Sequence, residues 1–283
     1  MCFKGTTRRP SAQAVSSELD GLGASYNAFT SHEYTGYYAK VEKSLFLKAL
    51  DVVADIFLNS TLPAVEMEKE KGVVVGEIAM NEDDPPSHVA DIFTELLYGD
   101  QPAGWNIAGT REKVRAMTRE KMVEYRRKHY VASETTIVVA GNVDEARVWD
   151  DITLAFQNAP QGEKTGKEKI REEQESPKVK IQFKETEQTH LILGFRSFDV
   201  YNEQQKVIRL VASILGGGMS SRLFKRVRDE MGAGYYVHAS NDFFTDHGFF
   251  SVATGVANER VKEVLAAILE EITALAKNPV SSE

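Results

Sequence analysis

Two glutamates on one predicted helix are the residues whose type and spacing most plainly offer chemistry. Glu70 and Glu77 belong to the run Val65–Met80, whose apolar spacing predicts a helix. Side chains seven residues apart on a helix lie within about 20° of each other on its surface. Because Val73–Val75 border this face, we expect at least one carboxylate to be partly buried, and such a carboxylate needs a cation or a metal as partner. A pair of solvated glutamates is the alternative.

Other groups lack the neighbours that their chemistry would need. Glycines 216–218 lack the Lys-Ser/Thr of a phosphate-binding loop, so they predict a tight turn between two helices. His32 and Glu33 have no second histidine one helical turn further on, and they lie on a predicted strand. Cys2 is the single cysteine and no Gly-x-Ser-x-Gly motif is present, so no nucleophile for acyl transfer is expected.

The composition excludes several classes of partner. The 283 residues hold 34 Lys and Arg against 42 Asp and Glu, a net charge of −8, with no basic stripe, so we expect no nucleic-acid partner. No apolar run approaches the roughly 20 residues of a membrane-spanning helix, so no membrane span is expected. The first ten residues carry no apolar core and do not resemble a secretory signal. We therefore expect a cytoplasmic protein, unless a targeting sequence precedes Met1.

The sequence repeats itself at an offset of 211 residues. Segments 18–28 and 229–239 share one frame, in which glycines and an alanine match: Gly21, Gly23 and Ala28 against Gly232, Gly234 and Ala239. Each copy continues into an aromatic strand and then into a helix with one apolar face. That face holds Leu45, Ala49, Val53 and Ile56 in the first helix and Val261, Val264, Leu265, Ile268 and Ile272 in the second. This order predicts two similar domains.

The same offset makes the two copies unequal in extent. The second copy ends early, and the strands predicted within 178–195 have no counterpart after Met1. We interpret the sequence as a fragment that is open at both ends.

The element pattern predicts an α+β fold in which each of the two domains packs a mostly antiparallel sheet against helices. Turn residues and periodicity predict helices over 10–22, 65–80, 88–98, 118–128 and 144–157, with Ser87 capping the third. They predict strands over 25–30, 34–41 and 135–140 and within 178–195. A charged stretch with few apolar residues separates the domains, which gives 1–159, the linker 160–178, and 179–283.

Four segments in one order carry a resemblance to a known family: Met1–Ser11, Asn27–Thr35, Glu70–Ile78 and Arg228–Tyr235. They resemble motifs of the insulinase or pitrilysin family of inverted zinc metallopeptidases, which includes the mitochondrial processing peptidases. The match extends over most of the chain.

The resemblance implies a zinc site of which this chain holds one part. In such peptidases two histidines of an H-x-x-E-H helix bind zinc and the glutamate between them is the general base. The third ligand follows the second histidine by about 76 residues. If that histidine stood directly before Met1, the ligand would be Glu77, and Glu70 would orient the site or assist the base.

The resemblance also assigns residues to the substrate. Asn27, Ala28 and Phe29 resemble the edge strand to which an extended peptide adds through backbone hydrogen bonds. Arg228 and Tyr235 resemble a pair that bonds the substrate backbone and helps to stabilise the oxyanion. An ordinary half-buried strand and a surface arginine beside a tyrosine are the structural alternatives.

The sequence departs from the family at the centre of its chemistry. It contains no H-x-x-E-H, and its six histidines offer no substitute pair on one helix. We therefore expect a fragment of a zinc metalloendopeptidase of the processing type, whose intact parent binds Zn²⁺ and hydrolyses peptides or unfolded polypeptides, while this chain alone is inactive. A non-catalytic peptide-binding partner subunit is the alternative, and a homodimer or a related second subunit is a possible assembly.

Overall fold

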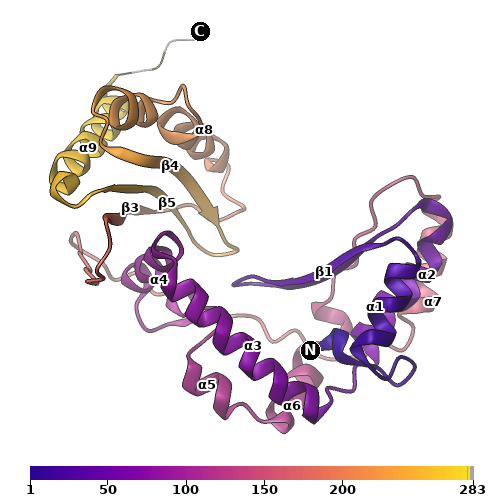
Figure 1. Cartoon of the computed structure of the whole chain (residues 1–283). Helices are drawn as coiled ribbons and strands as arrows, with labels where there is room; N and C mark the ends of the chain where they lie inside the picture. Colours follow the sequence, from indigo (N-terminus) through magenta and orange to yellow (C-terminus); the bar gives the residue numbers. More distant parts are fainter. Residues whose placement is uncertain (279, 281–283) are drawn as a thin grey trace. The chain divides into compact units, whose positions relative to one another are not determined.

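Helices and two antiparallel sheets make up the computed structural model, which describes residues 1–278 and 280 (Figure 1). The α+β class predicted from the sequence is confirmed. The helices are α1 Ala12–Gly21, α2 Phe46–Leu58, α3 Ala64–Asp83, α4 Pro85–Tyr98, α5 Arg111–Ala116, α6 Arg119–His129, α7 Glu145–Ala155, α8 Gln205–Gly216 and α9 Val261–Lys277. The strands are β1 Ser25–Thr30, β2 Thr35–Lys40, β3 Gln188–Ser197, β4 Gly234–Phe243 and β5 Gly248–Ala257.

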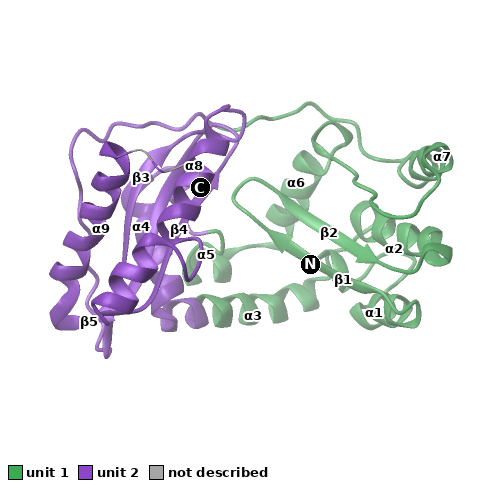
Figure 2. Cartoon of the chain, turned by 90° about the horizontal axis from the view of Figure 1, so that it is seen from above, with its two compact units in different colours: residues 1–78, 107–167 green, residues 79–106, 168–283 purple. Residues whose placement is uncertain are grey.

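The chain divides into two compact units (Figure 2). The first comprises Met1–Ile78 and Ile107–Lys167, and the second comprises Ala79–Asn106 and the chain from Glu168 onward. The unit boundary therefore falls inside α3, and α4 belongs to the second unit. The predicted domain limits at 159 and 179 stay a prediction.

In the first unit, α1 and α2 pack against the two-stranded sheet formed by β1 and β2. Its core cluster contains Cys2, Val15, Leu19, Val52 and Ile56, all of them buried. The buried face of α2 passes through Val52, whereas the sequence pattern placed Val53 there; Val53 is only partly buried.

A buried arginine fixes the start of the chain to this core. The Arg9 side chain, 7% exposed, donates hydrogen bonds of 2.7 Å to the carboxylates of Glu18, Asp51 and Asp55. The Thr6 hydroxyl donates to Asp55 as well, at 2.6 Å. Because a buried charge is stable only with partners, this network holds the segment before α1 against α2.

In the second unit, helices cover both faces of a three-stranded sheet of order β3-β5-β4. Successive strand residues point to opposite faces. Val252 and Val256 of β5 therefore join the core under α8 and α9, whereas Phe249 packs with Phe93 and Leu97 of α4.

Both units contain the predicted repeat: a helix, a glycine turn, an antiparallel hairpin and a second helix. In each copy the glycine two residues before the first strand has a positive φ, 62° at Gly23 and 58° at Gly232, which favours glycine at that position. The sequence frame aligned Gly23 with Gly234, so the structural match is shifted by two residues. The second hairpin also has ten-residue strands where the first has six.

The strand predicted over 135–140 does not form, and of the strands predicted within 178–195 only β3 does. Residues 135–140 and 178–183 have no regular secondary structure, and β3 begins only at Gln188. Their side chains lie open, with Val138 81% and Phe183 90% exposed. A strand needs a neighbour to accept its backbone hydrogen bonds, and neither segment pairs with another within residues 1–278 and 280.

Two smaller predictions concern where one helix begins and where the chain turns. The helix predicted to start at His88 with Ser87 as its cap begins at Pro85, because Asp84 is the cap and accepts a hydrogen bond from the Ser87 amide. Gly216 is the last residue of α8 and Gly217 is its C-cap, so the three glycines lie at the turn between α8 and the π-helix Phe224–Glu230, as predicted. The stretch 160–178 has no helix or strand.

Candidate functional site

The two glutamates singled out in the sequence lie on α3 in different surroundings. Glu70 forms an ion pair of 2.9 Å with Lys4, and the two side chains are 27% and 30% exposed. This is the cation that a half-buried carboxylate was predicted to need. Glu77, one heptad further on, is exposed, and no hydrogen bond or ion pair to it occurs among the described residues. A carboxylate without a partner is the form in which a ligand is available to a metal.

A strained turn, held by two arginine hydrogen bonds, sets where α3 begins. Leu62 has a φ of 46°, which is uncommon for a residue with a side chain, yet it is only 3% exposed. Arg119 at the start of α6 donates to the carbonyl of Leu62 at 2.7 Å and to that of Thr61 at 2.9 Å. These bonds fix the turn from which the carboxylate-bearing helix extends. Nothing in the sequence singled out Arg119.

The ligand groups of this chain do not by themselves fit a catalytic zinc site. Such a site takes three protein ligands and one open position. Within the described residues no three His, Cys, Asp or Glu side chains are grouped closely enough to hold a metal ion. The role of Glu77 as a zinc ligand therefore stays a prediction.

The predicted substrate residues lie on a strand with one open side. β1 pairs only with β2 within the described chain, in the register Ala28 opposite Tyr37 and Asn27 opposite Tyr38. Ser31 donates to the carbonyl of Tyr34, and hydrogen-bonded pairs alternate along an antiparallel ladder. The backbone groups of Ala28 therefore point away from β2, toward the open edge.

Two side chains of β1 shape this edge. The Asn27 amide oxygen accepts a hydrogen bond of 2.8 Å from the Ala28 N–H, the edge donor itself. The Phe29 ring lies over Gly36 and packs edge-on against Tyr34, with 5.7 Å between centroids, and is 47% exposed. A Cβ at Gly36 would come within 2.4 Å of the Phe29 ring, so the glycine leaves room for it.

A shallow pocket lies beside this strand. It is lined by Phe3, Lys4, Ala12, Ser16, Tyr26 and Asn27. The rings of Phe3 and Tyr26 are stacked along it with 5.9 Å between centroids. Lys4 lines the pocket and also pairs with Glu70, so one side chain contacts both α3 and the pocket beside β1. Sequence reasoning missed Lys4 and Phe3, although both stand in the motif Met1–Ser11.

Arg228 and Tyr235 lie close together in the second unit, where the side chain of one bonds the backbone of the other. The Arg228 guanidinium donates to the Tyr235 carbonyl at 2.7 Å and lies over the Phe224 ring, 5.2 Å from its centroid. The ladder of β4 and β5 shifts register between Gly234 and Tyr236, so Tyr235 is an extra, bulged residue whose side chain is 74% exposed. π-Helices and β-bulges are both over-represented at functional sites, where a bulge re-aims a side chain.

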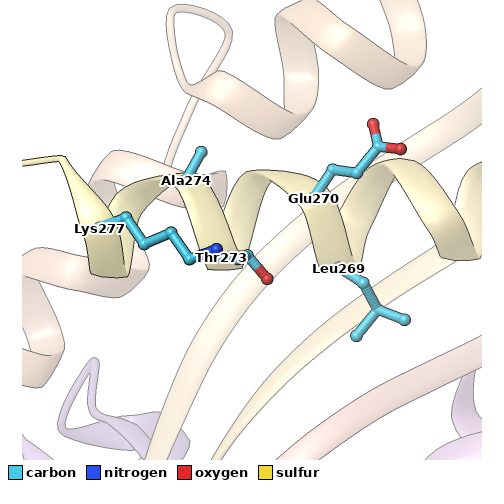
Figure 3. Close-up of a pocket in the computed structure, with 5 residues that line it drawn as sticks. All are labelled: Leu269, Glu270, Thr273, Ala274 and Lys277. Carbon is cyan, nitrogen blue, oxygen red and sulfur yellow. The ribbon is translucent and has the colours of Figure 1, made fainter.

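A second pocket is lined by none of these residues. Its lining side chains belong to α9 alone: Leu269, Glu270, Thr273, Ala274 and Lys277 (Figure 3). They point to different sides of one helix, and none of the predicted site residues is among them. It is not a candidate for the site.

Comparison with known protein families shows to which family this chain belongs. Residues 1–111 match the family described as insulinase (peptidase family M16), and residues 116–283 match the one described as the peptidase M16 inactive domain. The chain belongs to peptidase family M16. Glu70 and Glu77 thus lie in the part of this M16 chain that matches the peptidase description, and Arg228 and Tyr235 in the part that matches the inactive domain.

Its relatives carry names that point to zinc. The M16 chain is 34% identical, over its whole length, to an uncharacterized zinc protease of Streptomyces coelicolor, and spans 63% of that relative. It is 35% identical to the uncharacterized zinc protease YmxG of Bacillus subtilis, of which it spans 68%. A zinc peptidase family is therefore established, while the roles of the individual residues stay predictions.

Solved structures agree on the fold. A peptidase M16 inactive domain from Pseudomonas fluorescens matches 99% of this chain and 68% of its own, with a TM-score of 0.90 at 20% identity. A protease from Helicobacter pylori follows at 0.88 and 18%, matching 99% of this chain and 69% of its own. At these identities the likeness shows the fold alone. No helix in the described part of the M16 chain is long and apolar enough to cross a membrane.

Proposed function

We propose that this chain supplies the third zinc ligand, Glu77, and the substrate-binding strand of a zinc-dependent endopeptidase that acts on extended polypeptides. The observation that carries the proposal is the link through Lys4, which pairs with Glu70 of α3 and lines one pocket with Asn27 of β1. This link supports the proposal, because one side chain contacts both the carboxylate helix and a pocket beside the strand.

The residues divide the work by their chemistry. The open edge of β1 offers backbone donors and acceptors that an extended peptide pairs with whatever its sequence, and the exposed Phe29 ring adds apolar contact. Arg228 and the exposed Tyr235 offer donors that stabilise negative charge on a substrate oxygen. Zinc, when bound with the help of Glu77, would supply an activated water.

Zinc binding tests the assignment of Glu77. The protein to use is the chain extended before Met1 by a segment with H-x-x-E-H, purified in zinc-containing medium. We expect close to one zinc per chain, and a loss of at least tenfold in zinc affinity for Glu77→Gln, because a metal site loses one of three ligands. Zinc content by mass spectrometry is the readout.

A matched control separates this loss from damage to α3. Glu68→Gln changes an exposed glutamate of the same helix that pairs with Lys71. It should leave zinc content unchanged. Full zinc in the Glu77 variant, or equal loss in both variants, would contradict the assignment.

A peptide-binding partner subunit without catalysis is the second candidate. One observation favours it: more than half of the chain matches the family described as an inactive domain. The two candidates share the β1 edge but differ at Glu77, which a partner subunit would not need. Two results together would favour the partner subunit. In the extended chain, Glu77→Gln would leave both the zinc content and the rate of peptide hydrolysis unchanged, and Ala28→Pro would abolish peptide binding.

A further inference from the structure

The bulge that carries Tyr235 has two possible positions in its ladder. β4 has two residues, Tyr235 and Tyr236, where its partner strand β5 has one, Gly255. Because a bulge sets two residues of one strand against one of the other, either tyrosine could face Gly255 while the other was the extra residue. In the structure Tyr236 faces Gly255, and Tyr235 is the extra residue with its side chain exposed. Both residues are tyrosines, so strand preference does not select between them.

A pair of rings on one face of the sheet distinguishes the two tyrosines. His190 of β3 and Tyr236 of β4 both lie directly opposite Gly255 of the central strand β5, one on each side of it. Residues directly opposite each other point to the same face of a sheet. The two rings are stacked with 5.9 Å between centroids, and the Tyr236 hydroxyl lies 3.1 Å from His190 Nδ1. The pair therefore joins the two outer strands across the central one.

The space at Gly255 and the protonation of the two rings both suit this pair. A Cβ on Gly255 would lie 2.7 Å from the Tyr236 ring and 3.2 Å from the His190 ring, so only glycine leaves room for both. Burial lowers the pKa of His190 and raises the pKa of Tyr236. Near neutral pH the imidazole is therefore uncharged and the hydroxyl keeps its proton, which lets the hydroxyl donate to Nδ1.

Two further hydrogen bonds hold the backbone of the bulge. The Arg228 guanidinium donates to the carbonyl of Tyr235 at 2.7 Å. The Thr254 hydroxyl, which has no exposed surface, donates to the carbonyl of Tyr236 at 2.6 Å. A bulge disrupts the ladder locally and leaves its extra residue unpaired, so a change of the extra residue would turn both carbonyls. These two bonds therefore stabilise the same position of the bulge as the ring pair does.

We propose that His190 and Tyr236 are positioning residues, which keep the bulge at Tyr235 and so hold the Tyr235 side chain outward. The inference rests on the proposed function in one respect, namely that Tyr235 is a donor to a substrate oxygen. The position of the bulge rests on the register, the ring pair and the space at Gly255. The two parts can be tested separately.

Chemical modification tests the position of the bulge in the chain as it is. Tetranitromethane nitrates exposed tyrosine side chains, and tandem mass spectrometry measures the extent of nitration at each of them. In Tyr236→Phe only Tyr235 can offer a hydroxyl to His190 across the central strand, so we expect the bulge to move. Nitration of Tyr235 should then slow about fivefold, the factor by which one hydrogen bond shifts an equilibrium.

Tyr98→Phe is the matched control for this change. Its hydroxyl donates to the Gly248 carbonyl, at the other end of β5, with a distance of 3.4 Å. Tyr98→Phe thus removes one hydroxyl and one hydrogen bond from the same unit, and it should leave nitration of Tyr235 unchanged. Nitration of Tyr235 that is unaffected by Tyr236→Phe, or slowed equally by both substitutions, would overturn the proposal.

Kinetics of the chain extended by H-x-x-E-H test whether the pair acts through Tyr235. We expect Tyr236→Phe to lower kcat for peptide hydrolysis about fivefold and to change KM less than about twofold, because a displaced oxyanion donor weakens transition-state binding. Tyr235→Phe should lower kcat in the wild-type background and have little further effect in the Tyr236→Phe background. His190→Gln, which keeps an acceptor for the Tyr236 hydroxyl, should retain a higher kcat than His190→Leu.

The inference and the proposed function fail in different ways. If the extended chain hydrolyses no peptide, or if Tyr235→Phe leaves kcat unchanged, the catalytic role of Tyr235 is wrong, and the nitration rates still decide the position of the bulge. If Tyr235→Phe lowers kcat by the same factor in both backgrounds, the function stands and the positioning role is overturned.

Circular dichroism of each variant shows whether it retains the fold of the wild-type chain. If Tyr236→Phe fails to fold, His190→Leu replaces it in both experiments, because it removes the same hydrogen bond from the other side. The expected result is then nitration that rises at Tyr236 and falls at Tyr235, together with a lowered kcat. Unchanged nitration at both tyrosines of that variant would overturn the proposal.

Discussion

Arg9 is the side chain on which most of the first unit's electrostatics converge. It bonds three carboxylates and is nearly inaccessible to water, whereas its neighbour Arg8 bonds Asp51 from a position 57% exposed. The two adjacent arginines share the partner Asp51 and differ in burial, so they form a natural pair for comparison.

Arg9→Met should lower the free energy of unfolding of the first unit by about 3–5 kcal/mol, because it leaves the buried Asp55 without its cation. Arg8→Met removes an exposed ion pair and should cost only about 0.2–1 kcal/mol. Urea unfolding followed by circular dichroism measures both. Equal effects of the two changes would show that burial of Arg9 does not govern the network.

The same network predicts how stability depends on pH. Hydrogen bonds from Arg9 lower the pKa of Glu18, and those from Arg8 lower the pKa of Asp51. Burial alone would raise the pKa of Asp55, but hydrogen bonds from Thr6, Asn59 and Arg9 outweigh it and leave that pKa lowered too.

Carboxyls with a lowered pKa in the folded chain bind fewer protons there than in the unfolded chain, so acid favours unfolding. Their stabilisation is complete above the unfolded values of about 4 and is lost as pH falls from there through the folded values. We expect the thermal midpoint of the wild-type chain to fall between pH 5 and pH 3, and Arg9→Met to show a shallower fall. Identical slopes for the two proteins would speak against this account.

The sequence predicted which residue types would interact at the candidate site, but not which residues would be their partners. The spacing of Glu70 and Glu77 predicted a shared helix face and a cation for the buried carboxylate, and Lys4 provides that cation. The identity of Lys4 could not be predicted, because it comes from a segment 66 residues away that only the folded chain brings to α3. The Leu62 turn and its bonds from Arg119 were unpredictable for the same reason.

At the scale of elements, the helices were predicted well from local sequence, whereas the cap of α4 and the pairing of strands were not. The helices predicted over 10–22 and 118–128 form as α1 and α6, and Ser11 and Thr118 cap them, because a cap depends on residues within one turn. The strand predicted over 135–140 and the first half of the stretch 178–195 have the composition of strands but no partner within residues 1–278 and 280, whereas the second half of that stretch forms β3. Composition reports what a segment prefers, and only the rest of the fold provides a neighbour.

Hydrogen exchange should separate paired from unpaired segments directly. We expect amides over 135–140 to exchange nearly as fast as in an unfolded peptide, and those over 249–256 of β5, which has a strand on each side, to be protected by several orders of magnitude. Strong protection over 135–140 would mean that the segment is paired after all.

At the scale of the whole molecule, each unit has a hydrophobic core of its own. Ile56 and Ile268 are completely buried, one in each unit. Units with separate cores unfold as separate cooperative transitions when few contacts couple them.

Ile56→Ala should lower the free energy of unfolding of the first unit by about 2–5 kcal/mol, and Ile268→Ala that of the second by a similar amount. Differential scanning calorimetry should then show one of two transitions shifted in each variant and the other in place. A single transition that moves with both substitutions would show that the units unfold together.

The hydrogen bond from Ala28 to the Asn27 side chain has a consequence for turnover. A polypeptide that adds to β1 must first break this bond of 2.8 Å, at a cost of about 1 kcal/mol, or roughly fivefold in affinity. The strand thus occupies its own outward donor whenever no polypeptide is present, which discourages aggregation through that edge. In the proposed function the same bond would speed the departure of cleaved products, since the asparagine returns to the amide as each fragment leaves.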